Sequence, residues 1–399
     1  MQDPKTKRAI HESDVTGLVT EVTRGTITRR QFVVRAAALG LSTGAIGSLL
    51  AACGKKKSSP TSSGTGAGVT YPSEAPGKLS LYNWADYMSP KAKKDFQNEY
   101  GIEVVETYYD SNEELLAKLK AGATGYDVIV PSDYMVSIMI KTGLLMPLDM
   151  ALLPNFKNCE PFLQNPEFDP GVNGPDGKKY SVPYMFGTTG IGIRVDKYTG
   201  EVTGWEPMFD PANKGKIVML NDERETPGAA LKSLGYSLNS TEDSQLKEAQ
   251  DKLVAQKPLV VKYDSNPNRV LAAGNPLTHC WDGDVIMAGN NVGMDLLKYV
   301  LPSQGYVIWA DGMAMPVGAK TPYGAHLFMN YLMDTNVAAE CANYTGYQTG
   351  VATAAPLVKS EAQKALRPTT EQMKKAEFIK DLGEYGRKYT ELWTQVKSA

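Results

Sequence analysis

Aromatic side chains stand next to carboxylates at four places in the sequence. The four groups are Trp84-Ala85-Asp86-Tyr87, Ser132-Asp133-Tyr134, Trp281-Asp282-Gly283-Asp284 and Trp309-Ala310-Asp311. Ring faces attract ammonium groups and cover methylene chains, at about 0.5–2 kcal/mol for each cation–π contact. Carboxylates accept charge-assisted hydrogen bonds from amines. These residue types therefore indicate an organic cation as the ligand, and Asp222 and Glu225 add two further carboxylates.

Signatures of catalysis and metal binding are missing from the sequence. It has no H-E-x-x-H, P-loop or G-x-G-x-x-G motif, and its G-x-S-x-G at residues 40–44 lies in an expected export signal. Beyond that signal only His279 and His326 remain, which does not support a zinc site. Its 42 Lys+Arg residues do not exceed the 44 Asp+Glu residues, so no basic surface is indicated. We expect a binding protein rather than an enzyme, without cofactor, metal or nucleic-acid partner.

Alternating strand and helix signals must position these groups. The expected strands cover residues 79–83, 102–108, 126–130 and 216–220. Ser89-Pro90 places a capping residue before a proline, and Ser111 with Glu114 forms a capping box, so helices follow the first two strands. Pro131-Ser132 offers a cap for a third helix. This alternation predicts parallel sheets, which bind ligands at the carboxyl ends of their strands.

The length of 399 residues predicts two lobes, and 42% hydrophobic residues suffice for a sizeable core. The aromatic–acid groups that begin at Trp281 and Trp309 are expected at the ends of two further strand or helix segments. The groups at Trp84 and Ser132 are expected at the ends of strands. Residues 370–396 have helical spacing and are expected to pack across one lobe.

The first 77 residues are expected to be an export signal followed by a flexible tether. Paired arginines in Thr28-Arg29-Arg30 resemble a Tat export signal, and Leu50-Ala51-Ala52-Cys53 resembles a bacterial lipobox. The apolar stretch between them has 17 residues with three glycines, which is short for a membrane-spanning helix. We therefore expect a signal peptide at 1–52, and a lipidated Cys53 with a flexible tether at 53–77.

Removal of the signal peptide changes the charge and the cysteine count. Residues 1–52 carry seven Lys/Arg and four Asp/Glu, so the net charge moves from −2 to −5, which favours cationic ligands. Three cysteines then remain, Cys159, Cys280 and Cys341. At most one disulfide is possible, and the sequence does not select the pair.

Three segments resemble the bacterial spermidine/putrescine-binding proteins, the solute receptors of polyamine ABC transporters. They are Tyr82-Asn83-Trp84-Ala85-Asp86-Tyr87, Tyr126-Asp127-Val128-Ile129-Val130-Pro131-Ser132-Asp133-Tyr134 and Trp309-Ala310-Asp311. The resemblance covers residues 79–397. It implies a two-lobed α/β fold of the type II periplasmic-binding-protein kind with a ligand cleft between the lobes, whose implied boundaries are 78–183 plus 309–355 for lobe 1 and 184–308 plus 356–399 for lobe 2.

The resemblance also implies twelve ligand-binding residues. They are Trp84, Asp86, Tyr87, Ser132, Tyr134, Asp222, Glu225, Trp281, Asp284, Trp309, Asp311 and Tyr347. The rings would pack on methylenes, and the acids and Ser132 would bind amines. For some of these residues a structural role is the alternative: Asp222 or Glu225 would cap a helix and Asp284 would be a turn residue. Asp133, Asp282 and Glu223 are expected to be solvated or structural.

Four positions give conflicting signals about the ligand. Ala85 stands where the family usually has a hydroxyl, and Ile379 replaces a glutamine of spermidine binders. Asp284 resembles putrescine-preferring members, whereas Trp309 resembles spermidine binders. The preferred polyamine, putrescine or spermidine, therefore stays open, as does the affinity.

The sequence as a whole predicts a monomeric polyamine receptor. It would be exported and lipid-anchored to the outer face of the cytoplasmic membrane, and would deliver its ligand to an ABC transporter permease with its ATPase. The alternatives are a receptor for another organic cation, a sugar, an amino acid or ferric ion, the last because of Tyr108-Tyr109, or a polyamine sensor. The sequence does not identify the transporter or separate transport from sensing.

Overall fold

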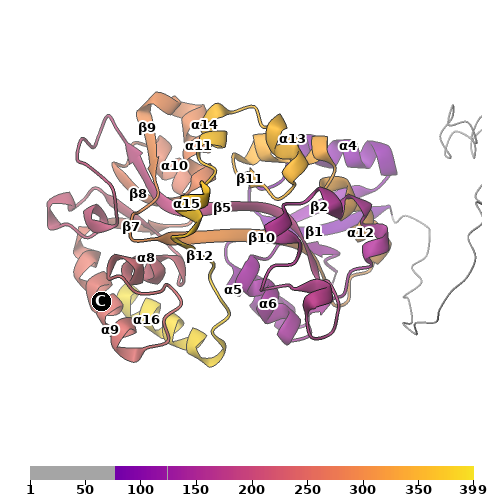
Figure 1. The fold of residues 1–399 in the computed structure, drawn as a ribbon, viewed down its shortest axis with the longest axis horizontal. Helices are drawn as coiled ribbons and strands as arrows, with labels where there is room; N and C mark the ends of the chain where they lie inside the picture. Colours follow the sequence, from indigo (N-terminus) through magenta and orange to yellow (C-terminus); the bar gives the residue numbers. More distant parts are fainter. Residues whose placement is uncertain (1–76, 124) are drawn as a thin grey trace, which may run out of the picture. The chain divides into compact units, whose positions relative to one another are not determined.

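The computed structural model describes residues 77–123 and 125–399. The predicted signal peptide, Cys53 and nearly all of the tether therefore lie outside the described residues. The described strands form one mixed sheet in the order β2-β1-β3-β10-β5-β8-β6-β7, with β4 and β12 on β10 and with β9 and β11 on β5 (Figure 1).

Three parallel strands form the first half-sheet. They are β1 (Lys78–Trp84), β2 (Glu103–Tyr109) and β3 (Val128–Ile129). The helices packed around this half-sheet are α4 (Pro90–Tyr100), α5 (Asn112–Lys120), α6 (Asp133–Lys141), α12 (Pro322–Leu332) and α13 (Thr335–Thr345). The predicted alternation of strands and helices is confirmed here, although β3 is shorter than the strand expected at residues 126–130.

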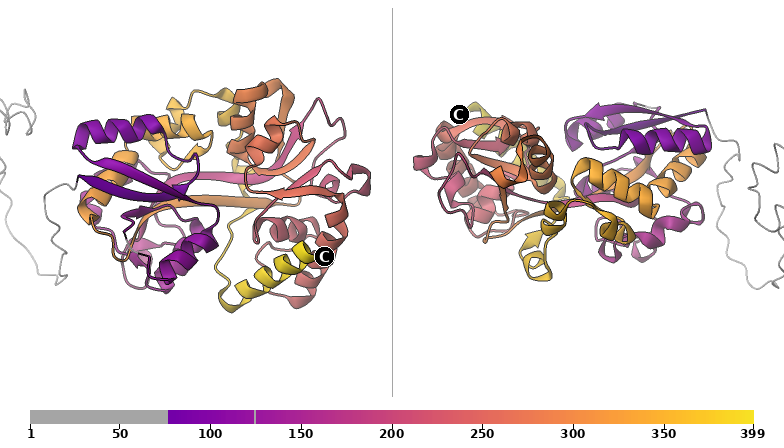
Figure 2. Two further views of the ribbon diagram at one scale, coloured as in Figure 1. Left: turned by 180° about the vertical axis from the view of Figure 1, so that it is seen from behind. Right: turned by 90° about the horizontal axis from the view of Figure 1, so that it is seen from above.

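A second half-sheet repeats the pattern with β6 (Ile217–Leu220), β7 (Val260–Asp264) and β8 (Leu277–Trp281), which are also parallel. The helices that accompany it are α8 (Glu225–Ser233), α9 (Asp243–Gln256), α10 (Pro267–Ala272), α11 (Asp282–Val292) and α16 (Gly386–Ser398). Figure 2 shows the two half-sheets on either side of a pair of long strands.

The long strands β5 (Ser181–Arg194) and β10 (Tyr306–Pro316) join the two half-sheets. They pair antiparallel from Ser181↔Ala314 to Thr188↔Ile308, and the remainder of β5 pairs with β8 and with β9 (Leu297–Val300). All residues of both strands are buried, as expected for a central strand covered on both faces. Near the crossing, β11 (Gln348–Thr349) adds a short third strand beside β5.

The expected helix caps are present, with one exception. Ser89 caps α4, and Ser111 caps α5 by accepting a hydrogen bond from the Glu114 amide at 3.1 Å. Ser132 stands at the start of α6 but makes no capping hydrogen bond. Its hydroxyl donates instead to Asp311 Oδ1 at 2.6 Å, so this serine serves the pocket rather than the helix.

The helical spacing expected over residues 370–396 is interrupted in the structure, while its last helix, α16, packs on α8 and α9. Residues 370–396 form α15 (Thr370–Met373), then the short strand β12 (Ala376–Glu377), and then α16. β12 pairs with β10 at Tyr306 and Val307, and Gly383 has a positive φ of 56° that breaks the helical path. The extended segment between the helices brings Ile379 to the pocket described below.

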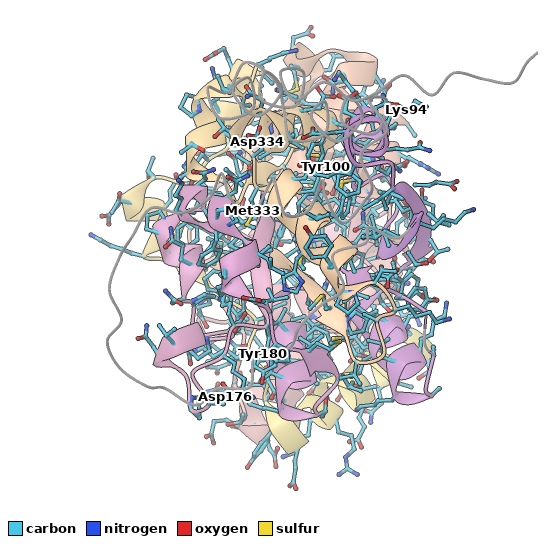
Figure 3. The ribbon with its side chains drawn as sticks, turned by 90° about the vertical axis from the view of Figure 1, so that its right-hand side faces the viewer. Lys94, Tyr100, Asp176, Tyr180, Met333 and Asp334 are labelled. Atoms are coloured by element: carbon cyan, nitrogen blue, oxygen red, sulfur yellow. The ribbon has the colours of Figure 1, made fainter. Side chains whose placement is uncertain are left out.

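Aromatic packing closes the first half-sheet on the side of α4 and α12. The Phe96 ring lies 4.8 Å from Tyr100 and 4.9 Å from Phe328, the second in an edge-to-face arrangement. Figure 3 shows this side of the molecule, with Tyr100 and Met333 labelled. Short α7 (Pro161–Gln164), α14 (Glu361–Ala365) and β4 (Leu145–Met146) complete the described α-helices and strands.

The three cysteines that the structure describes are buried and free. Cys159, Cys280 and Cys341 form no disulfide with one another, and burial raises the pKa of each thiol. They therefore belong to the packed interior and not to a reactive site.

Candidate functional site

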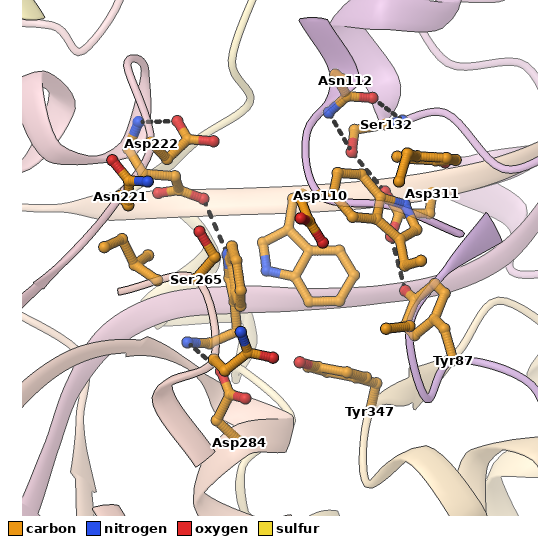
Figure 4. A pocket seen from close by; sticks show the side chains of 18 of the residues that line it. Tyr87, Asp110, Asn112, Ser132, Asn221, Asp222, Ser265, Asp284, Asp311 and Tyr347 are labelled. Atoms are coloured by element: carbon orange, nitrogen blue, oxygen red, sulfur yellow. Dashed lines mark hydrogen bonds between the residues drawn. The ribbon is translucent and has the colours of Figure 1, made fainter. Parts of the chain in front are cut away.

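One pocket brings together all twelve residues that the sequence assigns to the ligand. Its cavity volume is about 160 Å³, room for roughly ten water-sized groups. The other lining residues are Ala85, Tyr109, Asp110, Asn112, Asp133, Leu220, Asn221, Ser265, Asn266, Asn268, Met287 and Ile379. Figure 4 shows Asn112, Ser132, Asp311 and Tyr87 on one side, and Asn221, Asp222, Ser265 and Asp284 on the other.

The lining is strongly acidic. Seven of the described lining residues are carboxylic acids and none is lysine or arginine. Four of the acids, Asp133, Glu225, Asp284 and Asp311, are at most 6% exposed. Carboxylates buried without a cationic partner are costly, so this pocket is built for a ligand that brings positive charge.

Asp311 forms one polar end of the pocket. Its Oδ2 accepts a hydrogen bond from the Tyr87 hydroxyl at 2.7 Å, and its Oδ1 accepts from Ser132. The Asn112 side chain donates to the Ser132 hydroxyl at 3.0 Å and so holds it in place. The carboxylate is therefore fixed by two hydroxyl donors, in a position where a third partner on the pocket side would complete it.

The chain reaches this position through an irregularity in the sheet. Trp309 and Asp311 lie within β10 and not at a segment end, which corrects the sequence expectation. The pairing of β10 with β5 shifts register between Asp311 and Gly312. Such bulges re-aim side chains locally, and this one accompanies an isolated bridge between Ser132 and Asp311.

Glu225 and Trp281 form the opposite end. The register of β5 with β8 places Thr189 beside Trp281, and Glu225 Oε1 accepts from the Thr189 hydroxyl at 2.9 Å and from the Trp281 indole at 3.2 Å. Oε2 is buried and has no partner among the described residues. This oxygen is the acceptor that an ammonium group of a ligand would satisfy.

Asp284 and Asp222 lie at this same end, and each also supports a helix. Asp284 Oδ2 accepts the Trp281 amide at 3.1 Å at the start of α11. Asp222 Oδ1 accepts the amides of Arg224 and Glu225 at 2.7 and 2.8 Å, at the start of α8. Asp222 therefore caps the helix through Oδ1, as the alternative reading of the sequence proposed. The same residue also lines the pocket.

Aromatic rings connect the two ends. Trp309 stands edge-to-face on Tyr347 at 5.2 Å, and Tyr347 stands edge-to-face on Tyr87 at 5.6 Å. On the first half-sheet Trp84 packs on Tyr109 at 4.6 Å and donates its indole N–H to the carbonyl of Val130 at 2.9 Å. These contacts fix the rings, so that a methylene chain would meet a preformed slot.

The outer residues have different partners. Tyr134 donates to Glu113 Oε1 at 2.9 Å. Asp86 is 59% exposed, pairs with Arg269 at 3.6 Å, and is the one non-glycine residue in the described part of the chain with a positive φ. The family role of Asp86 in binding an amine therefore stays a prediction.

Burial controls the protonation of the acids. It raises the pKa of Asp311 to about 6, although the hydrogen bonds from Ser132 and Tyr87 act to lower it. Burial also raises the pKa of Asp284 to about 7. Burial raises the pKa of Glu225 to about 8, with a further contribution from Asp222. A bound cation would lower all three pKa values, because an adjacent positive charge favours the ionised carboxylate.

Sequence reasoning missed several residues at the site. Asp110 follows β2 directly and lines the pocket, so the strand-end rule applied to β2 would have found it. Glu113, the partner of Tyr134, is a second such residue: burial, with Asp222 and Glu223 nearby, raises its pKa to about 7. No sequence signal marks the contact between Glu113 and Tyr134. Asp133 was expected to be solvated or structural and is structural: its Oδ2 accepts the Ala310 amide at 3.0 Å.

Comparison with known proteins agrees with this geometry. The family model described as bacterial extracellular solute-binding protein matches residues 91–369. The chain belongs to this family. Among curated relatives, the spermidine/putrescine-binding periplasmic protein of Salmonella typhimurium is 34% identical over 326 residues, which cover 80% of this chain and 91% of that protein. The putrescine/cadaverine-binding protein of Pseudomonas aeruginosa is 35% identical, with 80% and 93% covered.

A solved relative shares the fold of this solute-binding protein. The spermidine/putrescine ABC transporter substrate-binding protein PotD of Streptococcus pneumoniae is 32% identical and superposes with a TM-score of 0.69, over 81% of this chain and 99% of that chain. The predicted α/β binding-protein fold and the resemblance to the polyamine-binding family are thus confirmed. Within the residues that the structure describes, no helix is both long and apolar enough to cross a bilayer.

Proposed function

We propose that this protein captures a polyamine in the pocket and delivers it to an ABC transporter permease. The observation that carries the proposal is a pair of buried acidic ends, Glu225 with Asp284 and Asp311 with its hydroxyl donors, joined by a slot of aromatic rings. A multiply charged amine supplies a cation at each end and methylenes between them. The names of the curated relatives support the same ligand class.

Ferric ion is less suited to this site than an amine. Tyr108 and Tyr109 are consecutive on β2 and differ in environment, because Tyr108 is 52% exposed while Tyr109 is buried and donates to the Val130 carbonyl. Among the described residues, no three His, Cys, Asp or Glu side chains gather in a way that would hold a metal ion. Zwitterions such as amino acids would place a carboxylate against an acidic lining.

Calorimetric titration tests the ligand assignment. Putrescine, spermidine and spermine are titrated into the wild type and into Asp311→Asn, with γ-aminobutyrate as a zwitterionic control. We expect one-site binding of at least one polyamine and no heat with the control. Asp311→Asn should weaken binding at least tenfold, or about 1.4 kcal/mol. Absence of heat and of a thermal shift with every polyamine would contradict the assignment.

The proposal also includes the export signal, the lipid anchor and the boundaries of the two lobes. Residues 1–52 act as a Tat-type signal peptide, and acylated Cys53 with the tether to residue 77 holds a monomeric receptor at the outer face of the membrane. Lobe 1 consists of 78–183 plus 309–355, and lobe 2 consists of 184–308 plus 356–399. Labelled palmitate should enter the wild type and not Cys53→Ala, which should leave the membrane fraction. Retained label in Cys53→Ala would contradict the anchor.

Delivery to a permease is separable from sensing. If the protein serves transport, deletion of its gene abolishes uptake of radiolabelled polyamine at micromolar concentration, and the wild-type gene restores it. Uptake that is unchanged, together with a lost transcriptional response to polyamine, would assign the protein to sensing instead.

A further inference from the structure

Two glycines lie directly beneath two rings of the pocket. Gly187 of β5 is the strand partner of Trp309 in β10. Gly283 stands in the first turn of α11, and the Tyr347 ring lies against it. Neither glycine contributes a side chain to the ligand, so neither is found by a search for residues with binding chemistry.

The Tyr347 ring occupies the space beside Gly283, and the Trp309 ring together with the Asp282 carboxylate occupies the space beside Gly187. A Cβ at Gly187 would lie 2.5 Å from Trp309 Cζ2 and 2.4 Å from Asp282 Oδ1. A Cβ at Gly283 would lie 2.3 Å from Tyr347 Cδ1 and 2.4 Å from Cε1. Carbon atoms in contact are normally about 3.5–4.0 Å apart, so a side chain at position 283 would displace the Tyr347 ring by roughly 1 Å. A side chain at position 187 would displace the Trp309 ring by a similar distance and would also push on the Asp282 carboxylate.

Backbone conformation does not explain these glycines. Fourteen described glycines have a positive φ, and neither Gly187 nor Gly283 is among them. Alanine would therefore fit the backbone at both positions. Gly283 is also helical, where alanine is intrinsically favoured over glycine by about 1 kcal/mol. What alanine would lose is the position of the ring and not the local fold.

The rings in question are coupled to the acidic ends. Tyr347 contacts both Trp309 and Tyr87, and Tyr87 donates to Asp311. Gly283 itself lies between Asp282 and Asp284. A ring displaced by a side chain at position 283 would thus disturb the slot, and through Tyr87 the carboxylate at its far end.

We propose that Gly187 and Gly283 are positioning residues that fix the width of the aromatic slot by letting Trp309 and Tyr347 rest on bare backbone. This inference rests on the proposed function for its ligand, while the ring positions themselves belong to the unliganded protein. It adds two residues without side chains to the determinants of amine binding.

Alanine substitutions in the whole chain test the proposal. Gly187→Ala and Gly283→Ala should each bind the polyamine that the wild type prefers at least tenfold more weakly. Gly228→Ala is the matched control, because it lies in α8 and its Cβ would meet only Leu238 Cβ at 3.4 Å; its affinity should stay within twofold. Thermal unfolding of all three variants shows whether they fold. Wild-type affinity in a folded Gly187→Ala or Gly283→Ala would overturn the proposal.

A double-mutant cycle separates positioning from a general structural role. The three atoms nearest to a Cβ at Gly283 all belong to the Tyr347 ring. Once Tyr347→Ala has removed that ring, adding Gly283→Ala should change affinity less than twofold, so the two effects are strongly non-additive. Additive losses would overturn the proposal, as would a Gly283→Ala variant that does not fold and is not restored to folding by Tyr347→Ala.

A structural readout keeps this proposal distinct from the ligand assignment. If the wild type binds no polyamine, the proposed function fails, yet the crystal structure of unliganded Gly187→Ala still tests the positioning role. We expect the Trp309 indole to be displaced by about 1 Å or more, with an altered near-UV circular dichroism spectrum. An indole that keeps its wild-type position would overturn the inference.

Discussion

Replacement of Glu225 by glutamine should weaken ligand binding and stabilise the unliganded protein at the same time. The substitution keeps the size of the side chain and an oxygen that accepts from Thr189 and Trp281, as Glu225 Oε1 does. It replaces Oε2, the buried oxygen without a partner, by an NH₂ group. That group is a donor and cannot accept a hydrogen bond from an ammonium.

The size of the binding effect follows from the lost contact. A hydrogen bond to a charged group contributes about 1.5–3 kcal/mol, which corresponds to a Kd raised by about 10- to 150-fold. Stability changes in the opposite direction. Burial raises the pKa of Glu225 from 4.5 to about 8, so its contribution to the folded state falls as the pH rises between those values. Glutamine does not ionise, so the variant does not lose this stability as the pH rises. Unliganded Glu225→Gln should therefore have a higher melting temperature than the wild type at pH 8.

The assay combines calorimetry with thermal unfolding at pH 8 and at pH 5. Glu223→Gln is the matched control, because Glu223 is two residues away, bonds to Thr390 at 2.9 Å and does not line the pocket; its Kd should change less than threefold. An unchanged Kd in Glu225→Gln would refute the assignment of an ammonium to Oε2. A fall in both affinity and melting temperature would show that the loss is structural.

Three further outcomes follow from the pocket. Because burial raises the pKa of Asp284 to about 7 and of Glu225 to about 8, affinity should be at least tenfold weaker at pH 6 than at pH 8, with proton release on binding seen as buffer-dependent heat; a flat pH profile would contradict this. Trp281→Ala should raise the Kd about 2- to 30-fold through its lost cation–π contact, which titration checks, and an unchanged Kd would remove Trp281 from the ligand. Ile379→Gln adds an amide acceptor to the lining and should shift the Kd ratio towards spermidine over putrescine; an unchanged ratio would place the ligand away from this residue.

The sequence predicts the site best where function follows local chain geometry. Trp84 is the last residue of β1 and Ser132 lies shortly after the end of β3, and the rule that parallel sheets bind ligands at the carboxyl ends of their strands places them together correctly. The same rule predicts the position of Glu225, which follows β6. The caps at Ser89 and Ser111 are equally local signals, and the structure confirms both.

What the sequence does not show depends on pairing between distant segments. The position of Trp309 and Asp311 within β10 results from pairing with β5, about 125 residues earlier, and from a bulge that no local pattern marks. Ser132 has the sequence context of a helix cap, but its hydroxyl is claimed by Asp311, 179 residues away. The roles of Gly187 and Gly283 are invisible without the rings that rest on them.

The crystal structure of the protein with its preferred polyamine tests the central claim most directly. We expect the methylene chain between the rings of Trp281 and Trp309, one ammonium within hydrogen-bond distance of Glu225 Oε2, and another beside Asp311. Polyamine bound elsewhere, or bound here with its ammonium groups away from both carboxylates, would contradict the account.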